Sequence, residues 1–167
     1  MELTVLLTRE GGVNGAISTV LGKRVHVDKR TSGAPYIKGD NHYLSLSHKD
    51  GYMVVALSDR PVGVDIERVV AKDAYFRIAD NYFAEKIAAG DADAFFRGWT
   101  RRESFGKMLG EGLSPEVMNL NMSLTSLSFR DQTVYFVEKR IDDYMITVAG
   151  AYPDAQMLNM GEKEDEE

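Results

Sequence analysis

The sequence contains no cysteine. Disulfide bonds, thiolate metal sites and cysteine nucleophiles are therefore excluded, and the chain fits a reducing compartment. Long apolar runs are missing as well, because the apolar stretch over residues 1–7 contains Glu2 and is too short to span a bilayer. No basic segment precedes it, as a secretory signal would require. We therefore expect a cytoplasmic protein with no membrane span.

An excess of basic residues is also missing. The chain has 20 Lys and Arg against 26 Asp and Glu, for a net charge of −6. Five acids and one base occupy residues 162–167, which leaves the rest of the chain with a charge of about −2. A body without a basic face argues against nucleic-acid binding. We expect a single domain over residues 1–155 and an acidic, disordered tail over residues 156–167, with a docking element as the alternative for the tail.

What the sequence does contain is a mixture of strand and helix patterns. Alternating or β-rich patterns predict strands, and the Lys49-Asp50-Gly51 turn predicts a hairpin between two of them. The strongest helix pattern covers residues 92–109 and ends at Gly110. This order predicts an α+β fold with an antiparallel sheet packed against a long helix. The expected strands are 2–8, 43–47, 52–57, 62–69, 126–130, 133–139 and 144–151; the expected helices are 13–22, 73–80 and 92–109; residues 29–42 are expected to form loops.

Two acidic residues share one face of the predicted strand 62–69. Side chains two apart on a strand project together, so Asp65 and Glu67 lie side by side while Val64 and Ile66 point into the core. Neighbouring carboxylates repel each other unless a cation lies between them or one carries a proton. Oxygen ligands on a rigid strand suit Mg²⁺. The alternative is a solvated acidic strand face.

The predicted long helix carries Glu103 and Lys107 at the edge of its apolar stripe. They are four residues apart, so their side chains are neighbours that can be half-buried and still open to a cleft. A surface ion pair of little energetic value is the alternative. Arg102 falls near the middle of the stripe, where we expect its guanidinium to snorkel outward or to bind an anionic group.

A third polar element, Ser47 followed by His48, lies at the end of the strand before the predicted hairpin turn. A histidine at the end of a strand can bind phosphate when it is protonated or when its N–H points outward. An exposed turn histidine is the alternative.

These elements occur in the order and approximate spacing of one family. Residues 44–48 resemble a strand motif that ends in Ser-His, and residues 61–67 resemble a Gly-x-Asp-x-Glu strand motif. Residues 99–107 resemble a Trp-x-x-Lys-Glu-Ser-x-x-Lys helix, with a matching turn at residues 110–113. Residues 33–37 resemble a Gly-Lys-Pro stretch. The chain therefore resembles the 4′-phosphopantetheinyl transferases, and among them the Sfp type more than the small trimeric holo-acyl-carrier-protein synthases.

The resemblance implies a Mg²⁺-dependent enzyme that moves the phosphopantetheine arm of coenzyme A onto a serine of an apo acyl or peptidyl carrier protein and releases 3′,5′-ADP. Metal ligands would be Asp65, Glu67 and Glu103, and the catalytic residues Glu103 and Lys107. Coenzyme A would be bound by Gly33, Pro35, Ser47, His48, Asp65 and Lys107. Glu103, directly or through a water, would take the proton of the carrier serine, while Lys107 would stabilise the leaving group.

The chain departs from the family pattern in three ways. Ala34 stands where the Gly-Lys-Pro motif has lysine, and Arg102 stands where the helix motif has lysine. The Sfp type is built from two similar halves, and here the N-terminal half is much shortened. We expect a compact monomer, with self-association as the alternative. A non-catalytic relative that binds carrier proteins or coenzyme A, and a metal-dependent phosphohydrolase, are the competing functions.

Overall fold

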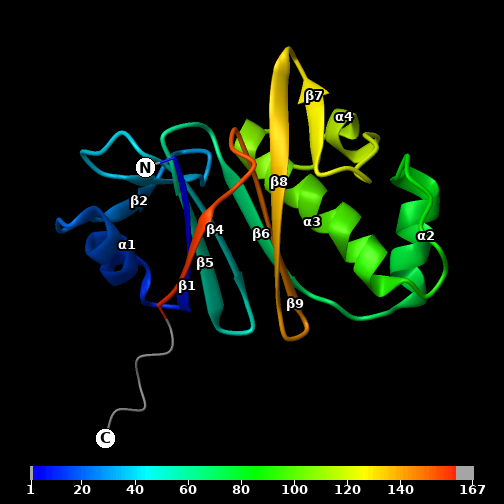
Figure 1. Ribbon diagram of the computed structural model, residues 1–167, viewed down its shortest axis with the longest axis horizontal. Coiled ribbons are helices and arrows are strands. Elements are labelled where there is room, and N and C mark those ends of the chain that lie inside the picture. Colours follow the sequence, from blue (N-terminus) through cyan, green and yellow to red (C-terminus); the bar gives the residue numbers. More distant parts are fainter. Residues whose placement is uncertain (1, 161–167) are drawn as a thin grey trace, which may run out of the picture.

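The computed structural model describes residues 2–160. Two four-stranded sheets lie side by side (Figure 1). The first has the order β10 (Gln156–Asn159), β1 (Leu3–Arg9), β5 (Tyr52–Ser58), β4 (Tyr43–Lys49); the second has the order β6 (Gly63–Arg68), β9 (Tyr144–Gly150), β8 (Gln132–Ile141), β7 (Ser126–Phe129). Neighbouring strands are antiparallel except β1 and β10. These two sheets place β4 and β6 at adjoining edges.

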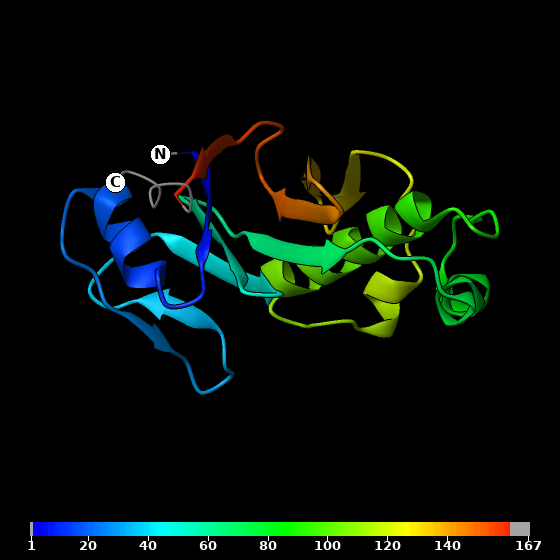
Figure 2. The same cartoon turned by 90° about the horizontal axis from the view of Figure 1, so that it is seen from below.

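Four helices and a small hairpin complete residues 2–160. They are α1 (Val13–Leu21), α2 (Asp73–Tyr82), α3 (Ala92–Leu109), the short α4 (Pro115–Met118), and the two-stranded sheet of β2 (Val27–Lys29) and β3 (Pro35–Ile37). Figure 2 shows α1 beside the first sheet and α3 running along the second. The predicted α+β fold with a long helix on an antiparallel sheet is confirmed, and α3 spans the predicted residues 92–109.

The central strands β1, β5, β6 and β9 are buried on both faces, so three apolar layers form. Alternate residues of β1, β5, β6 and β9 meet between the two sheets, including Val5, Val64 and Ile66. The opposite face of the first sheet packs against α1, and the opposite face of the second sheet packs against α3. This arrangement puts Asp65 and Glu67, which alternate with Val64 and Ile66, on the face of β6 that α3 covers.

Two expectations need correction, and one element is new. Residues 29–42 are not all loop, because Pro35–Ile37 pairs with Val27–Lys29. The boundary after residue 155 is wrong: residues 156–159, which we assigned to the tail, form β10 and pair in parallel with β1. The short helix α4 was not anticipated. The remaining acidic tail, residues 161–167, lies outside the described residues. Within residues 2–160, the helices are all too short or too polar to cross a membrane.

Candidate active site

The two sheets meet along a seam, the line where β4 and β6 lie beside each other. Side chains make this connection: the hydroxyl oxygens of Ser45 and Ser47 accept hydrogen bonds from the backbone N–H groups of Val64 and Ile66, at 3.1 and 3.2 Å. Both serines are buried. Buried backbone N–H groups need partners, so the two hydroxyls fix β6 against β4 in a defined register.

Lys107 of α3 also bridges the seam. Its ammonium group donates hydrogen bonds to the carbonyl oxygens of Leu46 on β4 and Val64 on β6, both at 3.1 Å. An ammonium group has three donors, so one N–H is left for another acceptor. The helix is therefore tied to both sheets through the residue that we predicted to contact phosphate.

The close approach of α3 to β6 depends on Gly63. A β-carbon at this position would lie 1.9 Å from the carbonyl oxygen of Ser104 on the helix. Further along, the hydroxyls of Thr100 on α3 and Thr147 on β9 are 2.7 Å apart, and Thr147 pairs with Asp65 across the sheet. This tight contact brings Glu103 and Lys107 to the carboxylates of β6.

Asp65 lies at the centre of the site and is 4% exposed. Its Oδ1 accepts a hydrogen bond from the Ser47 hydroxyl at 3.3 Å, whereas its buried Oδ2 has no hydrogen-bond partner among the described residues. Burial raises the pKa of Asp65 well above its ordinary value, and the charges of Glu67 and Glu103 add to this effect while Lys107 opposes it. A buried carboxylate oxygen without a partner is costly, so this atom calls for a cation or a proton.

Glu67 and Glu103 share this electrostatic environment. Burial raises the pKa of Glu67, against the opposing effects of Lys49, Lys107 and a hydrogen bond with Trp99. The Lys49 ammonium lies 3.8 Å from the Glu67 carboxylate. Burial, together with the charge of Glu67, likewise raises the pKa of Glu103, and Lys107 lowers it. Asp65, Glu67 and Glu103, the carboxylate cluster, therefore interact electrostatically.

The carboxylate cluster fits a hard cation such as Mg²⁺. All its donors are oxygens, and the unpartnered Oδ2 of Asp65 is available for a ligand bond. Within the described part of the chain, no three acidic or histidine side chains are already gathered closely enough to hold a metal ion. Mg²⁺ commonly binds through one or two carboxylates and completes its shell with waters and substrate phosphate, so the set does not need to be fully assembled.

The other predicted site residues, His48, Gly33 and Pro35, lie outside the carboxylate cluster. His48 follows Ser47 at the end of β4 but is well exposed, and its Nδ1 lies 3.0 Å from Oε1 of Glu10. Gly33 and Pro35 belong to the β2–β3 hairpin, with Gly33 at a φ of 90° in its turn. The structure thus brings Ser47, Asp65, Glu67, Glu103 and Lys107 together. His48 lies at the rim, and Gly33 and Pro35 lie on a separate two-stranded sheet.

Arg102 is fully buried and does not snorkel. Its guanidinium forms a two-pronged ion pair with Glu85, so the anionic partner we expected is part of the chain itself. The role of Ser45 and the hydrogen bond between Trp99 and Glu67 are two further features of the site that no sequence pattern predicts. An arginine in an apolar stripe signals a buried acid, but that signal does not identify which acid.

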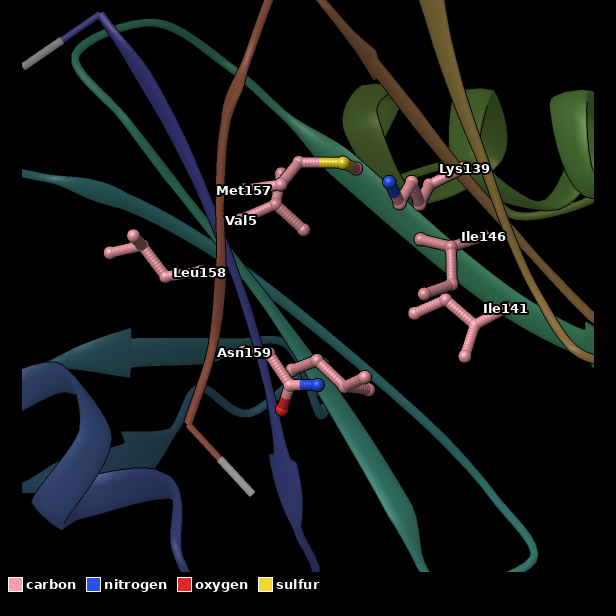
Figure 3. A pocket seen from close by; sticks show the side chains of 8 residues that line it. Val5, Lys139, Ile141, Ile146, Met157, Leu158 and Asn159 are labelled. Atoms are coloured by element: carbon pink, nitrogen blue, oxygen red, sulfur yellow. The ribbon is translucent and has the colours of Figure 1, made fainter. Parts of the chain in front are cut away.

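An apolar groove of about 280 Å³ lies on the other side of β6 from the carboxylate cluster, between β1, β10 and the β8–β9 hairpin (Figure 3). Val5, Ile141, Ile146 and Met157 line it, and Lys139 points toward it. Because the side chains of β6 alternate, this groove and the carboxylates are separated by the strand itself. The charged site and this apolar groove are therefore different places.

The chain is similar in sequence to known proteins. The family model of the 4′-phosphopantetheinyl transferase superfamily matches residues 61–149, which contain β6, α3 and all of β9 but its last residue. The 4′-phosphopantetheinyl transferase gsp of Aneurinibacillus migulanus is 36% identical over 93 residues, 51% of this chain and 38% of the relative.

Two proteins of Bacillus subtilis align over more of the chain. A 4′-phosphopantetheinyl transferase is 29% identical over 140 residues, 73% of this chain and 61% of the relative. The 4′-phosphopantetheinyl transferase Sfp of strain 168 is 26% identical over 163 residues, 83% of this chain and 71% of the relative. The aligned stretch thus spans between about two fifths and seven tenths of these relatives.

Proposed function

Since the chain belongs to the 4′-phosphopantetheinyl transferase superfamily, we propose that it transfers the 4′-phosphopantetheine arm of coenzyme A to a serine of an apo acyl or peptidyl carrier protein. In this reaction the serine oxygen forms a bond to the phosphorus of the arm phosphate. The bond between that phosphorus and the bridging oxygen of the pyrophosphate breaks, and 3′,5′-ADP leaves. The acceptor serine belongs to the carrier, so the chain needs no nucleophile of its own.

The observation that carries this proposal is the buried Oδ2 of Asp65, which has no hydrogen-bond partner within residues 2–160 and lies beside Glu67, Glu103 and Lys107. Phosphoryl transfer needs positive charge around the phosphate oxygens and an acceptor for the proton of the attacking hydroxyl. A bound Mg²⁺, held by Asp65, Glu67 and Glu103, would neutralise the pyrophosphate charge. Three interacting acids of raised pKa next to a lysine fit this role.

In the proposed reaction each residue has a defined task. Glu103, whose raised pKa makes it a better base than an ordinary carboxylate, accepts the serine proton directly or through a water. Lys107 uses its remaining N–H to stabilise the leaving phosphate. His48, exposed at the end of β4, binds phosphate at the nucleotide end and exchanges Glu10 for it. Gly33 and Pro35 complete the coenzyme A contacts, and Ala34 removes the one that a lysine would supply. We also propose that the protein acts in the cytoplasm and that it is a monomer.

The test is incubation of the protein with coenzyme A, Mg²⁺ and a panel of apo carrier proteins, followed by mass spectrometry. We expect at least one carrier to gain one phosphopantetheine. Glu103→Gln should lower the rate by about 10²- to 10⁴-fold. Glu116→Gln is the matched control: this exposed glutamate pairs with Arg130 away from the carboxylate cluster and should leave the rate unchanged. No mass gain on any carrier, with folded protein, would refute the proposal.

A non-catalytic relative that binds coenzyme A or carrier proteins is the second candidate. Ala34, which stands where the family motif has a lysine, favours it. Calorimetry separates the two: the transferase predicts Mg²⁺-dependent binding of coenzyme A, and this alternative predicts binding that does not depend on Mg²⁺. Release of free phosphopantetheine without a carrier would instead indicate a phosphohydrolase.

A further inference from the structure

The hydroxyl group of Ser47 makes two hydrogen bonds within the protein. It accepts the N–H of Ile66 at 3.2 Å and donates to Oδ1 of Asp65 at 3.3 Å. A hydroxyl has one proton to donate, and here that proton goes to the carboxylate. Ser47 is 7% exposed, so little of it can be reached by a ligand as large as a nucleotide. Its contacts therefore point inward to Asp65.

The hydrogen bond from Ser47 makes the two carboxylate oxygens of Asp65 different from each other. Oδ1 is held by the hydroxyl, which fixes the rotation of the carboxyl group, and Oδ2 is left buried without a partner among the described residues. A carboxylate that binds a metal ion through one oxygen is commonly hydrogen-bonded through the other, and such partners orient the ligand. Asp65 has this pattern.

Ser45 provides an internal comparison. It lies two residues earlier on β4, on the same face, and its hydroxyl accepts the N–H of Val64 at 3.1 Å. Both serines thus tie β6 to β4 in the same way and are similarly buried, at 4% and 7% exposure. Only Ser47 also contacts a carboxylate of the cluster. The two positions separate the backbone role from the role toward Asp65.

We propose that Ser47 is a positioning residue for the cation site: its hydroxyl holds Oδ1 of Asp65 so that Oδ2 is presented to the metal ion, and the hydroxyl makes no contact with coenzyme A. This inference rests on the proposed function, because it assumes that Asp65 is a metal ligand. It replaces the expectation that Ser47 contacts the nucleotide, and it leaves that contact to His48.

The experiment compares Ser47→Ala with Ser45→Ala. Binding of Mn²⁺, used as a probe for Mg²⁺, is followed by electron paramagnetic resonance of the free ion, on protein without coenzyme A. Each variant loses one hydroxyl that accepts a hydrogen bond from a backbone N–H of β6. The two substitutions should therefore weaken the contact between β4 and β6 to a similar extent. We expect Ser47→Ala to weaken Mn²⁺ binding by about 10- to 100-fold and Ser45→Ala to change it less than about twofold. Ser47→Cys, which keeps the size but donates weakly, should resemble Ser47→Ala and serves if the alanine variant does not fold.

Kinetics with a carrier protein provide the second readout. Ser47→Ala should raise the Mg²⁺ concentration needed for half-maximal rate, while the KM for coenzyme A at saturating Mg²⁺ stays within about twofold, because a positioning residue acts through the metal ligand. A raised KM for coenzyme A with unchanged metal dependence would overturn the inference in favour of a nucleotide contact.

The failures of the two proposals are distinguishable. If the wild-type chain binds Mn²⁺ but the Ser47 and Ser45 variants bind it equally well, the inference about Ser47 is wrong and the proposed function stands. If the wild-type chain binds no divalent cation with or without coenzyme A, the metal site of the proposed function is wrong, and the role of Ser47 falls with it.

Discussion

Arg102 and Glu85 form an ion pair inside the protein, with Nη1–Oε2 and Nη2–Oε1 distances of 2.8 and 2.6 Å. The Arg102 side chain is completely buried. Its other N–H groups donate to the backbone carbonyls of Gly98, Met118 and Leu120. All the hydrogen-bonding capacity of the guanidinium is thus used within the fold, on the residue next to Glu103. The pair fixes α3 to the segments that flank it at residues 85 and 118–122.

Removal of the positively charged Arg102 guanidinium should therefore lower the stability of the fold. Arg102→Met leaves the Glu85 carboxylate buried without its partner, and we expect the free energy of unfolding to fall by about 3–5 kcal/mol. Arg97→Met on the same helix is the control, since Arg97 and its partner Glu138 are partly exposed and such pairs contribute less than about 1 kcal/mol. Urea unfolding measures both. Equal losses in the two variants would contradict a stabilising role for the buried pair.

The same pair predicts how stability depends on pH. Burial alone would raise the pKa of Glu85, but the hydrogen bonds and charge of Arg102 hold it below the ordinary value of 4.5. The folded state therefore releases this proton more readily than the unfolded state. The stabilisation is complete above pH 4.5 and is lost as the pH falls through the lower folded pKa.

Unfolding free energies of the wild type and Glu85→Gln, measured from about pH 6 to pH 3, check this prediction. The difference between them should shrink as the pH falls, because glutamine does not titrate. Other acids of the fold contribute to both proteins and cancel in the difference. A difference that stays constant over this range would show that the Glu85 pKa is not depressed.

Gly63 permits the contact on which the site depends. In Gly63→Ala the new β-carbon would collide with the backbone of Ser104, so α3 must move away from β6. We expect a loss of stability of about 3 kcal/mol or more, accompanied by loss of transferase activity because Glu103 and Lys107 move with the helix. In Gly15→Ala on α1 the β-carbon meets open space, so that control should be neutral or slightly stabilising. Thermal unfolding and the carrier assay report the two effects.

Strand β10 completes the first sheet, and this can be tested by truncation. A chain that ends at residue 155 loses four backbone pairings with β1 and the apolar contacts of Met157 and Leu158. We expect it to be less stable than a chain that ends at residue 160 by about 2–4 kcal/mol, from the lost apolar burial. Equal melting temperatures for the two truncated chains would show that β10 contributes little.

Local periodicity explains which parts of the site could be predicted. Asp65 and Glu67 share a face because strand side chains alternate, and Glu103 and Lys107 are neighbours because they are four apart on a helix. These relationships need no knowledge of the fold. The antiparallel strands before β6 and the helix 92–109 were predicted for the same reason.

Contacts between distant segments could not be predicted in this way. Glu85 lies 17 positions before Arg102, beyond the start of α3, and nothing in the sequence distinguishes it from the other acids of that segment. Strand β10 joins the opposite end of the chain to β1 in parallel, and it has only four residues. The roles of Ser45 and Ser47 at the seam depend on how the two sheets meet, which no local pattern encodes.

Lys107 combines a structural contact with the proposed catalytic one, because its ammonium group links Leu46, 61 positions away in sequence, to Val64. Lys107→Met keeps the side-chain stem but removes both bonds, and we expect a loss of about 1–2 kcal/mol in the free energy of unfolding. Lys86→Met, which changes an exposed lysine, should have little effect. If the remaining N–H contacts the leaving phosphate, Lys107→Met should also lower the turnover rate under conditions where the variant is fully folded. Loss of stability without loss of turnover would assign Lys107 to the seam alone, and loss of turnover at unchanged stability would mean that the carbonyl contacts are readily given up to the substrate.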